Sequence, residues 1–195
     1  MDKSTLAKWL AAGTISIGGA LSVGSLIEPH EGSVKNKQGM HIAYLDAVGI
    51  PTVCYGQTGK DLYERTIRIG MPPFSEQECT EMLLKTVVKL EREIDRLVKI
   101  DYKSDYQKAA LISFVYNVGV GNFSSSTLLK DLNRGEHDLA CDRLSDWVYA
   151  KKKKLGGLVK RREEERQMCL GNVPQDVRMT YTEIVNLVKE TAEKK

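Results

Sequence analysis

The sequence has few of the features that mark nucleic-acid-binding or metal-dependent proteins. Its net charge is only +3 over 195 residues, which by itself is too small to indicate a nucleic-acid partner, although it favours weak attraction to an anionic one. The three histidines, His30, His41 and His137, form no HExxH motif and show no other metal-ligand spacing with the cysteines. We therefore expect no cofactor, no metal and no nucleic-acid partner.

Long uncharged stretches are scarce too, and a clear one lies near the N-terminus, from Trp9 to Ile27. Its nineteen residues are about enough to cross a bilayer core of about 30 Å. Lys3 and Lys8 precede it, which favours an N-inside, C-outside orientation. The stretch is only weakly hydrophobic because it contains four glycines and many small residues, and Ala12, Ser16, Ala20 and Gly24 recur at i+4 spacing.

Two interpretations of this stretch follow from its residues alone. It is a cleaved signal peptide, with Ala20 and Ser22 as the small residues that a peptidase requires, or it is a permanent membrane anchor. The rest of the chain has the composition of a folded protein, with 42% hydrophobic and 28% charged residues. Its length suits one good core or two small lobes that share a cleft.

The most informative stretch runs from Glu31 to Thr58. Its alternation and its turn residues predict a short β-hairpin or small sheet, with Asp46 and Thr52 on the sheet and Glu31 just before it. Two carboxylates and a hydroxyl around one hairpin are the groups that glycoside hydrolysis needs. Each residue taken singly is an ordinary surface, turn or strand residue, so the indication comes from the combination.

The order Glu31-Gly32, then Ala43-Tyr44-Leu45-Asp46, then Gly49, Thr52 and Gly56 resembles the active-site pattern of the phage-type lysozymes, which are endolysins and murein muramidases. The resemblance covers about residues 27–172. It implies an α+β, mainly helical, two-lobed fold with a small β-hairpin or sheet lobe. It also implies hydrolysis of the β-1,4 bonds between N-acetylmuramic acid and N-acetylglucosamine in host peptidoglycan, which causes bacterial lysis and virion release.

The same resemblance implies the roles of three residues in an inverting reaction. Glu31 would be the general acid, Asp46 the base that activates water, and Thr52 the group that holds this water. Two departures from the family pattern stand close to them. Residues 33–40 look like a polar insertion between the two carboxyls, and Gln57 stands where the family often has histidine.

Some phage endolysins carry a signal-arrest-release segment, a weak transmembrane helix that later leaves the bilayer intact. The resemblance adds this third interpretation of the N-terminal stretch, and the glycines Gly13, Gly18, Gly19 and Gly24 favour it. It implies a protein in the host inner membrane, bound through residues 9–27, and then in the periplasm. The expected division is a signal-anchor segment over 1–28, a catalytic domain over 29–172 and a charged tail over 173–195, with a monomer once the protein is soluble.

Helices should form most of the remaining chain. Ser75 and Glu78 form a capping box, which predicts an amphipathic helix over 75–99. Further helices are expected over 104–118, 127–133, 136–150 and 158–170, with a break at 119–122, a solvated loop at Lys151–Lys154 and a tail helix over 180–195. The family's helix–loop–helix beside the substrate cleft implies four candidate sugar contacts: Tyr116, Asn117, Phe123 and Thr127.

The four cysteines allow two disulfides. Cys141 and Cys169 are equidistant from Leu155, so an antiparallel helical hairpin about that point would bring both thiols to the same height. Cys54 and Cys79 are the remaining pair, and the resemblance supplies similar pairs in relatives. An oxidising periplasm would join both pairs, and four buried thiols are the alternative.

Other classes of function fit the sequence less well. A membrane-anchored structural or holin-like protein explains the N-terminus but gives the large folded domain no task. A murein-binding module without catalysis needs a cleft but no Glu–Asp–Thr set. A cysteine nucleophile is disfavoured because no histidine has a recognisable motif near Cys54.

Overall fold

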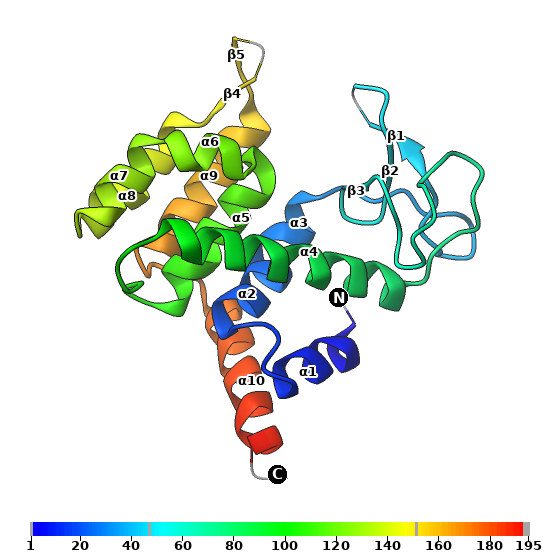
Figure 1. Ribbon diagram of the computed structural model, residues 1–195, viewed down its shortest axis with the longest axis horizontal. Coiled ribbons are helices and arrows are strands. Elements are labelled where there is room, and N and C mark those ends of the chain that lie inside the picture. Colours follow the sequence, from blue (N-terminus) through cyan, green and yellow to red (C-terminus); the bar gives the residue numbers. More distant parts are fainter. Residues whose placement is uncertain (1, 47, 151, 193–195) are drawn as a thin grey trace.

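The computed structural model describes residues 2–46, 48–150 and 152–192. Two lobes lie at opposite ends of one long helix, α4 (Glu76–Leu97), with a small β lobe at one end and a helical lobe at the other (Figure 1). This arrangement confirms the predicted mixed fold, mainly helical with a small antiparallel sheet.

The β lobe contains a three-stranded antiparallel sheet of β1 (Tyr44–Leu45), β2 (Pro51–Val53) and β3 (Gln57–Thr58), in that order. Tyr44 lies opposite Thr52, and Thr52 lies opposite Thr58. The two turns contain Gly49 and Gly56 with φ of +84° and +87°, a backbone conformation that glycine adopts at little cost. The sheet is short, and its register is what places the side chains discussed below.

The predicted capping box starts α4 as expected. The Ser75 hydroxyl accepts a hydrogen bond from the Glu78 N–H at 3.2 Å, and the Glu78 carboxylate accepts one from the Ser75 N–H at 2.8 Å. The apolar stripe of the helix is buried, as the three- and four-residue spacing predicts; it includes Cys79, Met82, Leu83, Val87 and Ile94. Because this stripe faces both lobes in turn, α4 is the rigid support of the molecule.

The N-terminal stretch is divided into several short helices in this structure. Helix α1 (Lys3–Ala11) ends at a turn with Gly13 at φ +63°, and Ser16 caps the next helix, α2 (Ile17–Ser22). A π-helix, η1 (Val23–Ile27), and the short α3 (Glu28–His30) complete it. Within the three described ranges, no helix combines the length and the apolar character that crossing a membrane requires.

This stretch is part of the protein core, since Leu21, Val23 and Ile27 are completely buried. Helix α2 packs most extensively against α5 (Asp105–Val118). A Cβ atom at Gly18 would lie 3.0 Å from the Lys108 Cβ, so the two helices can approach this closely only with glycine at that position. The expectation of a single transmembrane helix over Trp9–Ile27 is therefore not met in this state of the chain.

The helical lobe continues with α6 (Val120–Ser125), α7 (Thr127–Asn133), α8 (His137–Asp142) and the 3₁₀ helix η2 (Arg143–Asp146). The predicted break after residue 118 is present, since Gly119 ends α5 at φ +84°, but it is shorter than 119–122 because α6 begins at Val120. The predicted helix over 136–150 ends at η2, where the Trp147 ring packs edge-on against Phe114 at 5.2 Å and the chain turns away.

The lysine run Lys151–Lys154 contributes to a second, two-stranded sheet where a loop was expected. Strand β4 (Tyr149–Ala150) pairs with β5 (Lys153–Lys154), and the Lys153 and Lys154 side chains are exposed. Lys151 itself lies outside the described residues. Helix α9 (Gly156–Cys169) follows and begins two residues before the predicted start.

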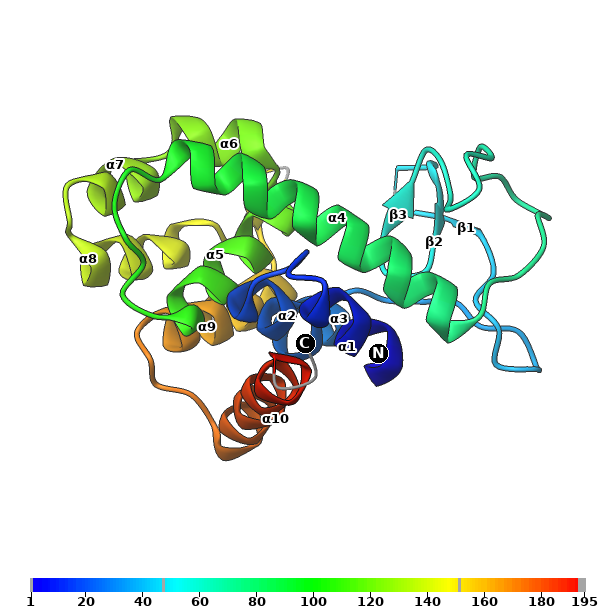
Figure 2. The same cartoon turned by 60° about the horizontal axis from the view of Figure 1, so that its bottom comes forward.

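The last helix, α10 (Gln175–Ala192), packs against α1 and α2 (Figure 2). The predicted tail helix thus exists but begins five residues earlier, and its last three predicted residues, 193–195, lie outside the described part. Ile184 is buried where α10 meets the core. The tail therefore covers the N-terminal stretch in this structure.

The structure joins Cys54 to Cys79 and Cys141 to Cys169, the two pairs that the sequence analysis expects. The second disulfide connects α8 to α9. Replacing both Cys141 and Cys169 by Ala should lower the free energy of unfolding by about 2–4 kcal/mol, because the crosslink restricts the unfolded chain. Urea denaturation of the oxidised protein and of this variant measures the difference, and an unchanged midpoint would argue against a stabilising role.

Candidate active site

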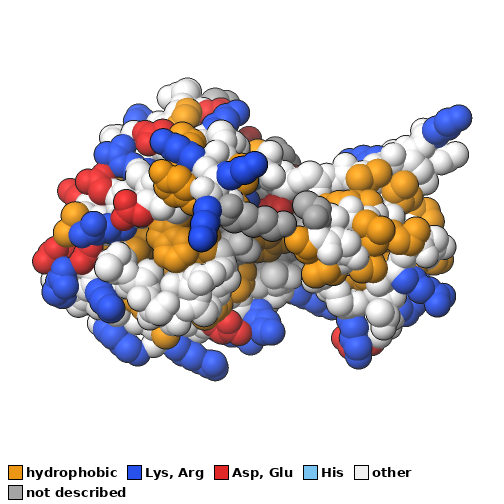
Figure 3. Space-filling view, turned by 90° about the horizontal axis from the view of Figure 1, so that it is seen from above, with side chains coloured by type: hydrophobic (Ala, Val, Ile, Leu, Met, Phe, Trp, Pro, Cys, Tyr) orange, Lys and Arg blue, Asp and Glu red, His pale blue; other side chains and the backbone are white. Residues whose placement is uncertain are grey.

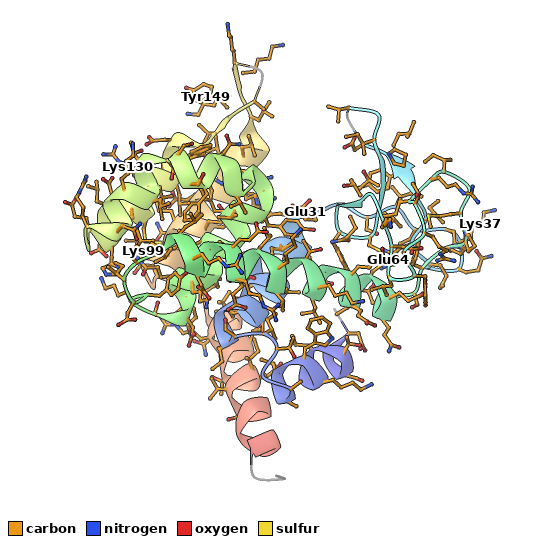
Figure 4. The ribbon with its side chains drawn as sticks, in the orientation of Figure 1. Glu31, Lys37, Glu64, Lys99, Lys130 and Tyr149 are labelled. Carbon is orange, nitrogen blue, oxygen red and sulfur yellow. A yellow bond between two sulfur atoms is a disulfide. The ribbon has the colours of Figure 1, made fainter. Side chains whose placement is uncertain are left out.

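Glu31 lies between the two lobes, at the end of α3 (Figure 4). Its backbone N–H donates to the Ile27 carbonyl at 2.9 Å, so the buried N-terminal stretch directly sets its position. Its side chain is 21% exposed, and Oε1 forms an ion pair with the Arg161 Nη1 of α9 at 2.8 Å. Arg161 is 130 residues further along the chain, and the sequence analysis did not place it at the site.

Gly56 brings the backbone of the β lobe against this carboxyl group. A Cβ atom at Gly56 would lie 3.2 Å from Glu31 Oε2 and 3.8 Å from the Tyr116 hydroxyl. Glycine therefore meets two requirements here, the positive φ and the close approach.

The β1–β2 hairpin places Asp46 and Thr52 on one face. Tyr44 and Thr52 are cross-strand neighbours, and Asp46 is two residues beyond Tyr44, so the three side chains point to the same side of the sheet. Asp46 Oδ1 accepts hydrogen bonds from the N–H groups of Val48 and Ile50, each at 2.9 Å, which shapes the hairpin tip. Neither of these two bonds uses Oδ2 of Asp46.

Thr52 is almost completely buried, with 3% exposure. Its hydroxyl donates to the Ile50 carbonyl at 3.0 Å. Because that bond uses its proton, the hydroxyl oxygen presents lone pairs to any further partner. Thr52 can therefore accept a hydrogen bond from a water molecule.

The phenol of Tyr44 connects the two carboxylates electrostatically. Burial, the charge of Glu31 and the charge of Asp46 all raise the pKa of Tyr44. Glu31 lies at the end of α3, whereas Asp46 directly follows β1 and Thr52 lies in β2.

A hydrogen-bonded group links the sheet to α5 beside Glu31. The Tyr116 hydroxyl donates to the Tyr55 carbonyl, and Gln57 Nε2 donates to the Tyr116 hydroxyl at 2.9 Å. Burial, followed by the Glu31 charge, raises the pKa of Tyr116. Gln57 therefore connects the β lobe to α5 at the position where the family often has histidine.

A cleft of about 630 Å³ opens next to this group, between β3, α4 and α5. Its lining combines polar groups of the β lobe with apolar side chains of the helices and includes Gly56, Gln57, Asp61, Met82, Leu90 and Tyr116. A concave site with a few convergent polar groups is typical of ligand binding. An extended polymer fits such an open groove better than a small molecule does.

The four candidate sugar contacts have different positions. Tyr116 lines the cleft, while Asn117 is exposed and accepts a hydrogen bond from Arg162 Nη2 at 3.1 Å. Thr127 is exposed on α7. Phe123 is completely buried with its ring against Phe114, so in this structure it is a core residue, and the expectation that it touches sugar is corrected.

A second network fixes α3 from the other side. The Tyr55 hydroxyl donates to Glu28 Oε1 at 2.7 Å and also contacts the Glu76 carboxylate. Glu76 Oε2 lies 2.9 Å from His41 Nε2 and 3.1 Å from Lys35 Nζ. The network therefore connects the end of the N-terminal stretch to the start of α4.

Glu76 should make stability depend on pH. Burial opposes its ionisation, but the bonds from Tyr55, His41 and Lys35 prevail and lower its pKa to about 2. Because this value lies below the unfolded one of 4.5, the contribution is complete above pH about 4.5 and is lost as pH falls towards 2. Urea denaturation should show a gap between wild type and Glu76→Gln at pH 7 that shrinks at pH 2, and a constant gap would contradict this.

The residues offer little to a metal ion. His41, Cys54 and Cys79 bring potential ligand atoms within 4.8 Å of one another, but the two sulfurs form a disulfide. His30 pairs with Glu164 at 2.6 Å, and His137 with Gln107 at 3.0 Å. These histidines serve structural contacts.

Known proteins share much of this sequence and fold. The family model of phage lysozyme matches residues 35–165, beginning just after Glu31. A SAR-endolysin of Bacteriophage PS119 is 42% identical over 156 residues, which cover 78% of this chain and 88% of that protein. Among solved structures, a mutant of lysozyme from Salmonella phage P22 superposes with a TM-score of 0.65 at 29% identity and covers 80% of this chain and 97% of its own.

The endolysin from Escherichia coli O157:H7 phage FAHEc1 gives a TM-score of 0.66 at 27% identity, over 82% of this chain and 96% of that one. Residues 35–165, which the family model matches, include the small sheet, the long helix α4 and most of the helical lobe. Glu31 lies just before this range. The chain belongs to the phage lysozyme family.

Proposed function

We propose that this chain is an endolysin that hydrolyses the β-1,4 bonds between N-acetylmuramic acid and N-acetylglucosamine in host peptidoglycan, and so lyses the cell. Membership of the phage lysozyme family supports the activity. The observation that supports the proposed site is the position of Glu31 at the end of α3, close to Gly56 of the β lobe and to Tyr116, which lines the open cleft. Glu31, Asp46 and Thr52 divide the chemistry among them.

The reaction needs one protonated and one ionised carboxyl group. Glu31 gives its proton to the glycosidic oxygen as the bond to the anomeric carbon breaks. Asp46 takes a proton from a water molecule whose oxygen attacks that carbon from the opposite face, and Thr52 holds this water. The Glu31 side chain is 21% exposed, so a glycan strand can reach it.

The activity is tested with the purified chain on chloroform-treated Gram-negative cells. Clearing of the suspension supports hydrolysis. A murein-binding module would bind the same cells without clearing them, which would overturn the proposal.

The N-terminal stretch has a second role in this proposal. Residues 1–28 first hold the protein in the host inner membrane, N-terminus inside, as a signal-arrest-release segment, and the stretch then leaves the bilayer intact. Its uncharged nineteen residues and the preceding lysines support the membrane stage. Its place in the core of the folded domain supports the released stage.

Release and activation are coupled through Glu31. In the membrane stage Glu31 lies only three residues beyond Glu28, so at most about 11 Å of chain separates it from the bilayer. The hydrogen bond from Glu31 to Ile27 and the bond from Tyr55 to Glu28 both require the stretch to be folded into the domain. The tethered form is therefore inactive, and the released form is a monomer in the periplasm, with residues 29–172 as its catalytic domain and 173–195 as a covering tail.

A further inference from the structure

Helix α9 carries three consecutive glutamates with different surroundings. Glu163 and Glu164 have side chains 53% and 42% exposed, and they pair with Arg166 and with His30. Glu165 is completely buried. A carboxylate buried within the helical lobe is costly to keep unless its partners compensate, so its contacts require an explanation.

Three hydrogen-bond donors and one further ion-pair contact converge on Glu165. Its Oε1 accepts hydrogen bonds from the Ser113 hydroxyl at 2.7 Å and from Arg161 Nε and Arg162 Nη2 at 3.1 Å each. Its Oε2 lies 2.9 Å from Arg162 Nε. Burial raises the pKa of Glu165, and the two guanidinium groups and Ser113 oppose this effect.

Arg161 is the group shared by Glu165 and Glu31. Its Nε faces Glu165, its Nη2 donates to the Ser113 carbonyl at 3.4 Å, and its Nη1 reaches Glu31 Oε1 at 2.8 Å. A guanidinium held on three sides has little rotational freedom. The orientation in which Arg161 meets Glu31 therefore depends on Glu165.

The cluster is also balanced in charge. Arg161 and Arg162 are 5% and 1% exposed, and their two positive charges meet the negative charges of Glu165 and Glu31. Burial lowers the pKa of Arg162, and its guanidinium also lies 5.0 Å from the Phe114 ring. Without Glu165, Glu31 would face two poorly hydrated positive charges by itself.

We propose that Glu165 is a positioning residue for the hydrolytic reaction: it holds Arg161 in place against Glu31 and offsets the second positive charge in the cluster. The inference rests on the proposed role of Glu31 as general acid. A general acid acts only while it carries its proton, so excess positive charge beside Glu31 favours the ionised, inactive form. Glu165 thus keeps the acid usable at higher pH.

The other groups that face the cluster come from several elements. They are Tyr44 and Asp46 of the β lobe, Tyr116 and Asn117 of α5, and His30 of α3 with Glu164. None of them is altered in the test below. A difference between variants therefore reports on the Arg–Glu cluster alone.

The test compares pH profiles of peptidoglycan hydrolysis for Glu165→Gln and wild type. For Glu165→Gln, the pH above which activity is lost should fall by on the order of one unit. Two unit charges several ångströms apart in a protein interact with an energy that corresponds to about one pKa unit. The matched control is Glu163→Gln, an exposed carboxylate on the same helix, whose profile should coincide with that of wild type. kcat should fall more than KM changes, since no contact with substrate is removed.

Two further variants separate charge from structure. Arg162→Gln removes one positive charge and should raise the pH above which activity is lost. The double variant Arg162→Gln with Glu165→Gln restores the balance and should return this pH towards the wild-type value. A general loss of packing would lower activity in the double variant further and would not reverse the shift.

The outcomes are distinct. Opposite shifts in the two single variants with reversal in the double variant support the proposal. Thermal unfolding shows which variants fold. If every folded variant has the same pH profile as wild type, the proposal is overturned. If Glu165→Gln does not fold, the comparison of Arg162→Gln with the double variant decides. Retained hydrolysis by Glu31→Gln would instead overturn the proposed function itself.

Discussion

Replacing Glu31 by Gln is expected to reduce the rate of peptidoglycan hydrolysis by on the order of 100-fold or more. General acid catalysis typically contributes 10²–10⁴ to a rate, and an amide cannot supply the proton. The isosteric side chain still fits between Gly56 and Arg161, so the fold should persist. Clearing of chloroform-treated cells and hydrolysis of purified peptidoglycan measure the effect.

The matched control is Glu163→Gln on α9. The Glu163 side chain is 53% exposed, pairs with Arg166 and does not line the cleft described above. This variant should clear cells at the wild-type rate. Near-normal lysis by Glu31→Gln would remove Glu31 from the reaction, whatever the control does.

Replacing Gly13, Gly18, Gly19 and Gly24 by Leu is expected to hold the protein in the membrane and to delay or abolish lysis. Leu is favoured over weakly hydrophobic residues in bilayer insertion, so four replacements should raise the cost of leaving by several kcal/mol. The structure adds a second effect. A Cβ atom at Gly19 would lie 2.8 Å from Ile15 and 3.0 Å from Glu91, so larger residues also hinder folding of the stretch into the domain.

Serine at Gly18 and Gly19 separates these two effects. It adds the same Cβ atoms but does not favour the bilayer, so this variant should leave the membrane normally and then show reduced thermal stability. Membrane fractionation and the time course of lysis distinguish the cases. Lysis on the normal schedule by the leucine variant while it is still membrane-bound would show that tethering does not restrain the enzyme.

Local signals in the sequence were sufficient for much of the fold. The Ser75–Glu78 capping box and the spacing of apolar residues predict α4 almost to the residue, and turn glycines locate the small sheet. Phe123 could not be assigned in this way, because an aromatic residue beside a loop can face either a cleft or the core. Packing against Phe114 decides the question, and that contact is tertiary.

The partner of Glu31 was also beyond sequence reasoning. The run from Arg161 to Arg166 predicts ion pairs between neighbouring turns, and Arg161 does pair with Glu165. Its other contact is with a residue 130 positions away, which no periodicity encodes. The sequence does not predict that one charged face of α9 is buried, because charged faces of helices usually face solvent. Most lysine and arginine side chains visible in Figure 3 follow that rule and lie on the surface.

The N-terminal stretch shows a different limit. Under the proposed membrane and released stages, one sequence has to suit two environments, and the folded structure describes only the released stage. The same small residues that weaken its hold on a bilayer allow α2 to lie against α5. The weak hydrophobicity is visible in the sequence, whereas the close packing of α2 against α5 is visible only in the folded structure.

The central claim is tested most directly by the chemistry of the ends that the enzyme creates. Purified peptidoglycan is digested with the chain, the new reducing ends are reduced with borohydride, and the resulting sugar alcohols are identified after acid hydrolysis. Cleavage between N-acetylmuramic acid and N-acetylglucosamine predicts muramitol, formed in step with the loss of turbidity. Glucosaminitol, new free amino groups without new reducing ends, or no new ends at all would contradict the assignment.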